Sequence, residues 1–177
     1  MTLFGDFSGL PEAEWIGDGR NMRLLQDFVY TDASGKQWSA PKGSVVDGAS
    51  IPKVLWSFVG GPFEGIYRDA SVVHDVACDK QTAPWGDVHV MFYWACRCGG
   101  VDELLAKILF SAVWHFGPRW SWPRPSVASN FQHEMTQSEN FQHEMTQSDL
   151  DKMRHFVETQ DPSLDRIMRF NPSKDGA

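Results

Sequence analysis

The sequence predicts an α+β protein that is mainly helical, with a small N-terminal antiparallel sheet followed by a three- to four-helix core. Short extended segments separated by turn residues are confined to the first 46 residues, which places the sheet there. Apolar residues then recur at helical spacing between residues 63 and 116, which places the helices after it. The 177 residues, of which 42% are hydrophobic, suffice for one domain with extensions.

The expected sheet is built from short elements. Residues 1–20 contain four glycines and a proline, and we expect them to form loops. A strand is predicted over residues 23–31, a turn over 32–35 and a returning strand over 36–40. A further extended piece at residues 44–46 leads out of the sheet.

The expected helices follow one another through short connections. A short helix is predicted over residues 50–58, with Ser50 as its cap, because a serine oxygen can accept a hydrogen bond from a free amide of the first turn. Longer helices are predicted over residues 63–80, 86–98 and 101–116. The last of these separates an apolar face from a charged face clearly, which is typical of a helix that packs on a core.

The composition changes after residue 117. Residues 1–117 are expected to form the core domain, and the proline- and tryptophan-rich residues 118–129 a connector. Residues 130–177 form a C-terminal extension that contains a perfect nine-residue tandem repeat, at 130–138 and 140–148. This extension is expected to be a solvated helical or disordered segment, and a protein partner could bind through it.

Charge and the N-terminal sequence limit the function classes. The net charge of −7 argues against nucleic-acid binding, which needs clustered lysines and arginines. The first residues show no signal peptide, and no apolar segment is long enough to cross a membrane. We therefore expect a protein that stays in the cytoplasm of the producing cell or is associated with a phage, with delivery by a non-classical route as a further possibility.

Two side-chain groups have an ordinary interpretation and a functional one. The three cysteines argue against a disulfide framework, and Cys96 and Cys98 would point to opposite sides of a helix, which disfavours a zinc pair. The aromatic cluster of Trp114, Trp120 and Trp122 either forms a belt at a membrane surface or folds back onto the domain.

Two polar residues fall where the predicted helices should be apolar. His74 lies within the stripe formed by Ile66, Ala70, Val73 and Ala77, and Asp87 begins the stripe of the next helix. A buried carboxylate requires a partner, so Asp87 is expected to pair with His74. Asp75 is expected on the more polar side of its helix. The His74–Asp87 pair is either catalytic or a structural link between two helices.

The order of the motifs carries a resemblance. The run Asp47-Gly48-Ala49-Ser50-Ile51-Pro52, the dipeptide His74-Asp75 and the helix that opens with Asp87 follow one another. This pattern resembles an uncharacterised family of phage and bacterial proteins, over residues 47–117. The resemblance implies membership of a family without an assigned activity.

A looser resemblance is to phospholipases A2. The glycine-rich segment at residues 60–65, followed by a helix with His74-Asp75 and a second helix with Asp87, is similar to their calcium loop and catalytic helices. The resemblance implies that His74 activates a water molecule and that Asp87 orients the His74 ring. It implies a Ca²⁺ ion held by Asp75 and by carbonyls of Gly60 and Gly61. Asp47 is either a further calcium ligand or closes a turn.

Three functions are therefore expected as alternatives. The first is a calcium-dependent acyl-ester hydrolase that acts on phospholipid at a membrane surface. The second is another metal-dependent hydrolase, in which His74, Asp75 and Asp87 bind a transition metal. The third is a non-enzymatic phage structural or interaction module, in which residues 130–177 bind a protein partner.

Overall fold

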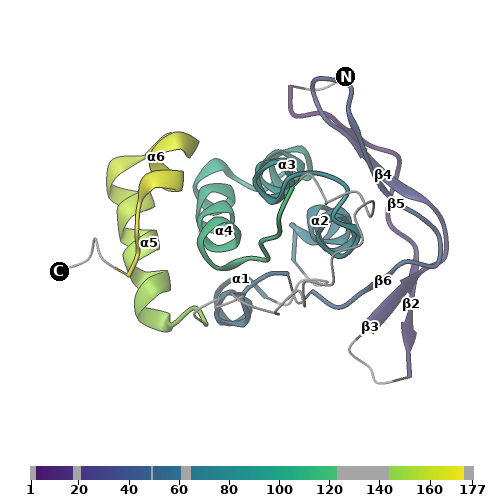
Figure 1. Cartoon of the computed structure of the whole chain (residues 1–177), viewed down its shortest axis with the longest axis horizontal. Coiled ribbons are helices and arrows are strands. Elements are labelled where there is room, and N and C mark those ends of the chain that lie inside the picture. Colours follow the sequence, from purple (N-terminus) through teal and green to yellow (C-terminus); the bar gives the residue numbers. More distant parts are fainter. Residues whose placement is uncertain (1–2, 18–20, 49, 61–64, 123–143, 174–177) are drawn as a thin grey trace, which may run out of the picture.

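The computed structural model describes residues 3–17, 21–48, 50–60, 65–122 and 144–173. It confirms the α+β class, with small antiparallel sheets before a set of helices (Figure 1). The strands are β1 (Asp6–Phe7), β2 (Ala13–Ile16), β3 (Asn21–Leu24), β4 (Phe28–Thr31), β5 (Gln37–Ala40) and β6 (Val45–Val46). The helices are the 3-10 turn η1 (Lys53–Leu55), α1 (Trp56–Val59), α2 (Arg68–Lys80), α3 (Trp85–Cys98), α4 (Glu103–Phe116), α5 (Gln147–Gln160) and α6 (Leu164–Arg169).

The strands form two three-stranded antiparallel sheets, in the orders β1-β4-β5 and β2-β3-β6. The predicted strand over residues 23–31 was therefore wrong as one element, because β3 pairs in one sheet and β4 in the other. The expectation of loops in residues 1–20 was also wrong. β1 has only two residues, and β2 is an edge strand of its sheet, so the pairing that defines them comes from strands later in the chain.

Gly5 is required where the N-terminal segment meets the end of β4. Its φ is +89°, and a Cβ atom there would lie 2.2 Å from the carbonyl oxygen of Thr31. We expect Gly5→Ala to lower the free energy of unfolding by at least about 2 kcal/mol, through backbone strain and this overlap. Gly35→Ala is the matched control, because Gly35 has a φ of +87° but open space around it. Urea unfolding of both variants separates the cost of the steric overlap from that of the positive φ. Equal losses of unfolding free energy in the two variants would contradict the prediction.

The helix α2 lies at the centre of the fold, between the sheets and α3 (Figure 1). All nine residues from 70 to 78 are buried, so the helix is covered on every side and not only along one stripe. The predicted start at residue 63 was too early, since α2 begins at Arg68, and Ile66 is exposed and outside the core. Burial on all sides explains why both His74 and Asp75 lie in the interior.

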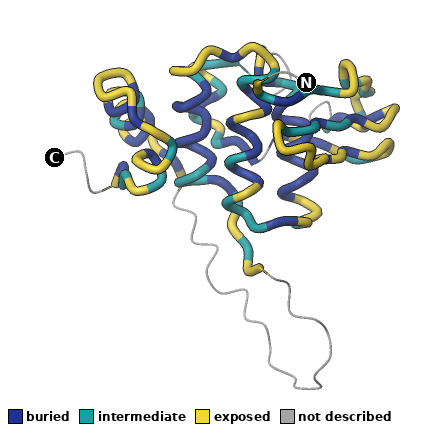
Figure 2. The backbone as a smooth tube through the Cα atoms, turned by 90° about the horizontal axis from the view of Figure 1, so that it is seen from above, coloured by how far each residue is buried: buried dark blue, intermediate teal, exposed yellow. Residues whose placement is uncertain are grey.

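The C-terminal helices are part of the same core. α5 begins after Thr146, whose side chain forms a capping box with Asp149. The two helices pack on α4. They contribute five buried apolar side chains, those of Leu150, Met153, Phe156, Val157 and Ile167. Figure 2 shows the buried residues concentrated in the middle of the molecule, between the N-terminal strands and the C-terminal helices.

Two of the three tryptophans of the cluster, Trp114 and Trp120, fold back onto the domain. The indole nitrogen of Trp114 donates to the carbonyl of Met168, and that of Trp120 donates to the carbonyl of Ala83. Trp122 is 45% exposed. None of the helices in the described parts of the chain is long and apolar enough to cross a membrane. The first copy of the tandem repeat, at 130–138, lies outside the described residues.

Candidate metal centre

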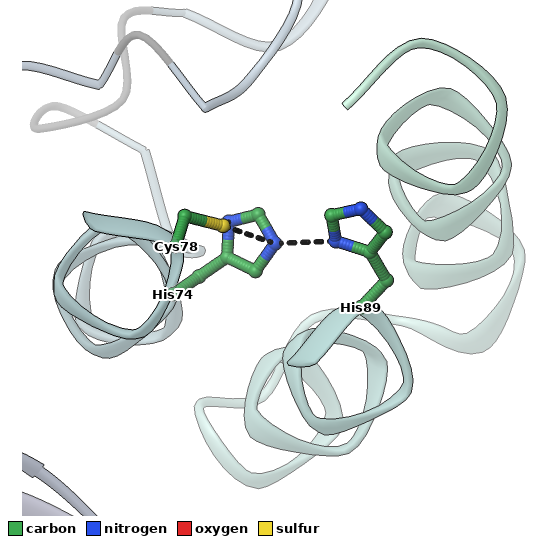
Figure 3. Close-up of side chains that lie close together, drawn as sticks. All are labelled: His74, Cys78 and His89. Carbon is green, nitrogen blue, oxygen red and sulfur yellow. Dashed lines mark hydrogen bonds between the residues drawn. The ribbon is translucent and has the colours of Figure 1, made fainter. Parts of the chain in front are cut away.

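Three side chains with metal-binding atoms meet between α2 and α3. His74 and Cys78 lie one turn apart on α2 and share a face, and His89 faces them from α3 (Figure 3). The His74 Nε2 atom lies 2.9 Å from His89 Nδ1 and 3.7 Å from Cys78 Sγ. One potential ligand atom from each residue lies within 4.8 Å of the others, and all three residues are buried.

The hydrogen-bond partner of His89 fixes which of its nitrogens carries the proton. His89 Nε2 lies 3.1 Å from the carbonyl oxygen of Pro118. A carbonyl oxygen can only accept, so Nε2 is the nitrogen that carries hydrogen. In the neutral ring the other nitrogen, Nδ1, then has a lone pair, and this lone pair points toward His74.

The partners of His74 fix its proton in the same way. The Ser50 hydroxyl donates to one carboxylate oxygen of Asp75, and the amide of Gly48 donates to the other at 2.7 Å. While Asp75 is ionised, the single hydroxyl proton of Ser50 goes to its carboxylate, and His74 Nδ1, 3.0 Å from Ser50 Oγ, is then the donor in that contact. The neutral His74 ring then has its lone pair on Nε2, directed at His89.

With these tautomers two lone pairs face each other across 2.9 Å, and a cation bound between them would stabilise this arrangement. A proton is disfavoured there. Burial lowers the pKa of His74 well below its usual value, and the neighbouring His89 lowers it further. Burial also lowers the pKa of His89 to about 4. A metal ion bound to both nitrogens is the other cation that suits two imidazoles beside a thiol.

The distances are close to those of a tetrahedral zinc site. Zinc–nitrogen bonds of 2.0–2.1 Å and zinc–sulfur bonds of 2.3 Å place two nitrogens about 3.3 Å apart and a nitrogen and a sulfur about 3.6 Å apart. The corresponding distances here are 2.9 Å and 3.7 Å, so the two rings would separate by a few tenths of an ångström. Burial raises the pKa of the Cys78 thiol, and coordination to a metal would deprotonate it.

A cavity of about 520 Å³ lies beside this group and would give access to a metal ion. Cys78, Ser50 and Asp75 line it, together with the exposed carboxylates of Asp47 and Asp79. The remaining lining residues are Asn21, Val45, Val46 and Pro118. Three protein ligands leave one tetrahedral position open, which is the pattern of catalytic zinc sites.

Of the residues singled out from the sequence, Asp75 and Asp47 line this cavity, and His74 contacts the lining residue Ser50. The expectation that Asp75 lies on a polar helix side was wrong, because the neighbouring β strands cover that side of α2. Burial raises the pKa of Asp75 to about 6, although the hydrogen bonds from Ser50 and Gly48 oppose this rise.

The expected pairing of Asp87 with His74 was wrong. Asp87 is exposed and borders a different cavity, of about 420 Å³, near Trp94 and Asp32. His89 follows Asp87 by two residues, so their side chains point about 200° apart around the helix, and only one of them can face His74. The stripe inferred for this helix was rotated, since Val88 and Phe92 lie at the centre of the buried face.

The glycine segment does not reach Asp75 through any contact in the described structure. The carbonyl oxygen of Gly60 accepts a hydrogen bond from the Tyr67 hydroxyl at 2.5 Å, and Gly61 lies outside the described residues. Both carboxylate oxygens of Asp75 accept from Ser50 and Gly48 instead.

Sequence reasoning missed Ser50, Cys78 and His89 as site residues. The spacing of His74 and Cys78, four residues apart on one helix, was a detectable signal. α3 continues through Cys98, so Cys96 and Cys98 point to opposite sides of a helix as expected. Cys96 is buried, whereas Cys98 is half-buried and its thiol donates to the carbonyl of Gly5.

Comparison with known proteins finds relatives but no assigned activity. The chain is 43% identical over 121 residues to the uncharacterized protein y4jT of Sinorhizobium fredii, and this aligned segment makes up 67% of this chain and 36% of that protein. It is 42% identical over 109 residues to the uncharacterized protein y4iH of the same organism, and here the aligned segment makes up 62% of this chain and 46% of that protein.

The chain thus spans less than half the length of these two relatives. No solved structure matches it. The model of a family described as protein of unknown function (DUF1353) matches residues 22–113, a range that contains Ser50, Asp75 and all three residues of the His74–Cys78–His89 group. The match extends over more than half of the sequence, and the chain belongs to the DUF1353 family.

Proposed function

We propose that this protein is a transition-metal-dependent hydrolase, with zinc as the metal and His74, Cys78 and His89 as its ligands. The observation that carries the proposal is the convergence of two histidine lone pairs and a thiol at one buried point. Imidazole nitrogen and thiolate sulfur are the donors that zinc prefers, and the open fourth position lies beside a cavity.

Hydrolysis is the chemistry that such a site supports. Zinc in an open three-ligand site lowers the pKa of a bound water to about 7, which supplies hydroxide as a nucleophile at neutral pH. The carboxylates of Asp47 and Asp79 line the same cavity, where they can accept a proton or bind a polar part of the substrate. The hydroxide would add to a carbonyl carbon, and the leaving group would depart with a proton.

Calcium-dependent hydrolysis of phospholipid has less support. Calcium binds six to eight oxygens, whereas both oxygens of Asp75 already accept hydrogen bonds and the Gly60 carbonyl accepts one from Tyr67. Three carboxylates line the cavity, and no lysine or arginine is among the lining residues that the structure describes. This charge opposes the entry of a phosphate ester.

A non-enzymatic role is the second candidate, because the complete burial of the two histidines is also what a purely structural metal site shows. In that case the metal would hold α2 and α3 together, and the protein would act through binding to a partner.

The test is metal analysis of the purified full-length chain, combined with hydrolysis assays on p-nitrophenyl esters, peptide anilides and phospholipid vesicles. We expect about one zinc ion per chain, and ester or amide hydrolysis that 1,10-phenanthroline abolishes and added zinc restores. His89→Ala should lose both the metal and the activity. Asp87→Asn should keep both, whereas the pairing inferred from sequence alone would require a loss.

Three other outcomes contradict the proposal. A bound zinc ion without hydrolysis of any of these substrate classes favours the structural role. Fatty-acid release that depends on calcium in a zinc-free protein favours the phospholipase. A chain that neither copurifies with a transition metal nor binds added zinc excludes the proposed centre.

A further inference from the structure

We infer that Ser50 and Asp75 are positioning residues that hold the His74 ring in the orientation and tautomer needed for metal binding. This inference rests on the proposed metal centre and deepens it. The Asp47-Gly48-Ala49-Ser50 segment and the His74-Asp75 dipeptide then form a single unit. The dipeptide supplies the metal ligand His74, and Ser50 and Asp75 together orient its ring.

The contacts form a continuous chain of hydrogen bonds behind His74. The amide of Gly48 and the hydroxyl of Ser50 donate to the two oxygens of Asp75, which fixes the carboxylate. The oxygen of Ser50 then accepts from His74 Nδ1 at 3.0 Å. Ser50 and Asp75 are both buried, at 6% and 7% exposure, so water does not easily replace any of these partners.

The hydroxyl of Ser50 has no capping role that would explain its burial. The sequence predicts that it caps the following helix, but the helical turn η1 begins after Pro52 and receives no side-chain hydrogen bond there. Within the part of the chain that the structure describes, its side chain bonds instead to His74 and Asp75, at the proposed metal centre.

The orientation matters because His74 has two nitrogens and only one can bind the metal. With Ser50 accepting from Nδ1, the lone pair of Nε2 is directed toward His89 and Cys78. Without that acceptor, the favourable tautomer is the one in which Nε2 carries the proton and donates to His89 Nδ1. Both metal-binding lone pairs are then blocked. Partners of this kind in other metal sites change metal affinity about 10–100-fold.

The test measures zinc affinity of the full-length chain, by competition with a chromophoric chelator, for four variants. We expect Ser50→Ala and Asp75→Asn to bind zinc about 10–100-fold more weakly than the wild type. Ser50→Thr retains the hydroxyl, and the extra methyl group can enter the adjoining cavity, so we expect near wild-type affinity. Ser71→Ala is the matched control, since Ser71 is a buried serine of α2 whose hydroxyl donates to the Tyr67 carbonyl and not to a residue of the metal centre.

Two spectroscopic readouts exclude a merely structural effect. Cobalt-substituted Ser50→Ala should show altered d–d bands, while Ser71→Ala should match the wild type. The ¹⁵N chemical shifts of His74 in the metal-free chain report its tautomer directly. We expect the proton on Nδ1 in the wild type and in Ser50→Thr, and on Nε2 in Ser50→Ala.

The outcomes separate this inference from the proposed function. Unchanged zinc affinity in a folded Ser50→Ala variant overturns the positioning role, and so does a wild-type His74 with its proton on Nε2. A wild-type chain that binds no metal but has the His74 proton on Nδ1 overturns the proposed hydrolase, while the orientation of the ring by Ser50 and Asp75 stands.

Discussion

Removal of the metal is expected to lower the free energy of unfolding by about 4 kcal/mol under conditions where free zinc is 1,000 times its dissociation constant. In the proposed centre the three side chains would bind the metal together only when α2 and α3 are packed, so binding would stabilise the folded state alone. For a chain of this size the loss corresponds to a fall in Tm of roughly 10 °C. Thermal unfolding with and without a chelator measures it.

Two cysteine variants make the result specific. Cys78→Ser should melt close to the chelated wild type and respond little to chelator, because a hydroxyl is a much weaker zinc ligand than a thiolate. Cys98→Ser should keep the full response to chelator. Its thiol lies outside the His74–Cys78–His89 group and donates to the carbonyl of Gly5, which a serine hydroxyl can also do. An equal chelator response in both variants would show that the metal binds elsewhere.

The limit of the sequence as a guide to this site is clearest in α3. Periodicity predicted the helix within one residue of its observed start, yet it assigned Asp87 to the buried face and did not single out His89 as a site residue. One residue corresponds to 100° around a helix, so a small error in the centre of a stripe exchanges one polar side chain for another. In α3 the predicted partner of His74 was therefore Asp87, whereas the observed partner is His89.

Helix α2 illustrates a second limit. An amphipathic interpretation assumes one covered face, whereas strands β4, β5 and β6 cover the side of α2 that α3 leaves free. The motif containing Ser50 and the motif containing His74 were both singled out by their order along the chain. Their contact joins residues 24 positions apart and depends on how the chain turns at Gly48, which no local pattern encodes.

The C-terminal helices show a third limit. Their positions in the sequence were partly predictable, but their packing against the rest of the core was not. α6 lies within residues 162–170, where the sequence favours a helix, and α5 extends at both ends beyond the helical segment expected over residues 149–157. Proline-rich residues before them suggested a separate extension. The buried faces of α5 and α6 complete the cover of α4, in which residues 106–113 are all buried.

Truncation after residue 122 is therefore expected to unfold the protein or convert it to a partly folded state. The five apolar side chains that α5 and α6 bury are each worth about 1.5–3 kcal/mol, a sum comparable to the total stability of a typical domain. The truncated chain would also expose one side of α4 and leave the Lys107 ammonium without Asp161, which lies 2.6 Å away. Loss of a cooperative melting transition and binding of a hydrophobic dye would report this state.

Point variants in the full-length chain test the same packing without removing any segment. Met153 is completely buried, so Met153→Ala should lower the free energy of unfolding by about 2–5 kcal/mol. Glu158→Ala, on the exposed side of the same helix, should change it by less than about 0.5 kcal/mol. If residues 1–122 instead form a stable monomer and Met153→Ala has no effect, the core ends before the connector, and the C-terminal helices are an attachment free to bind a partner.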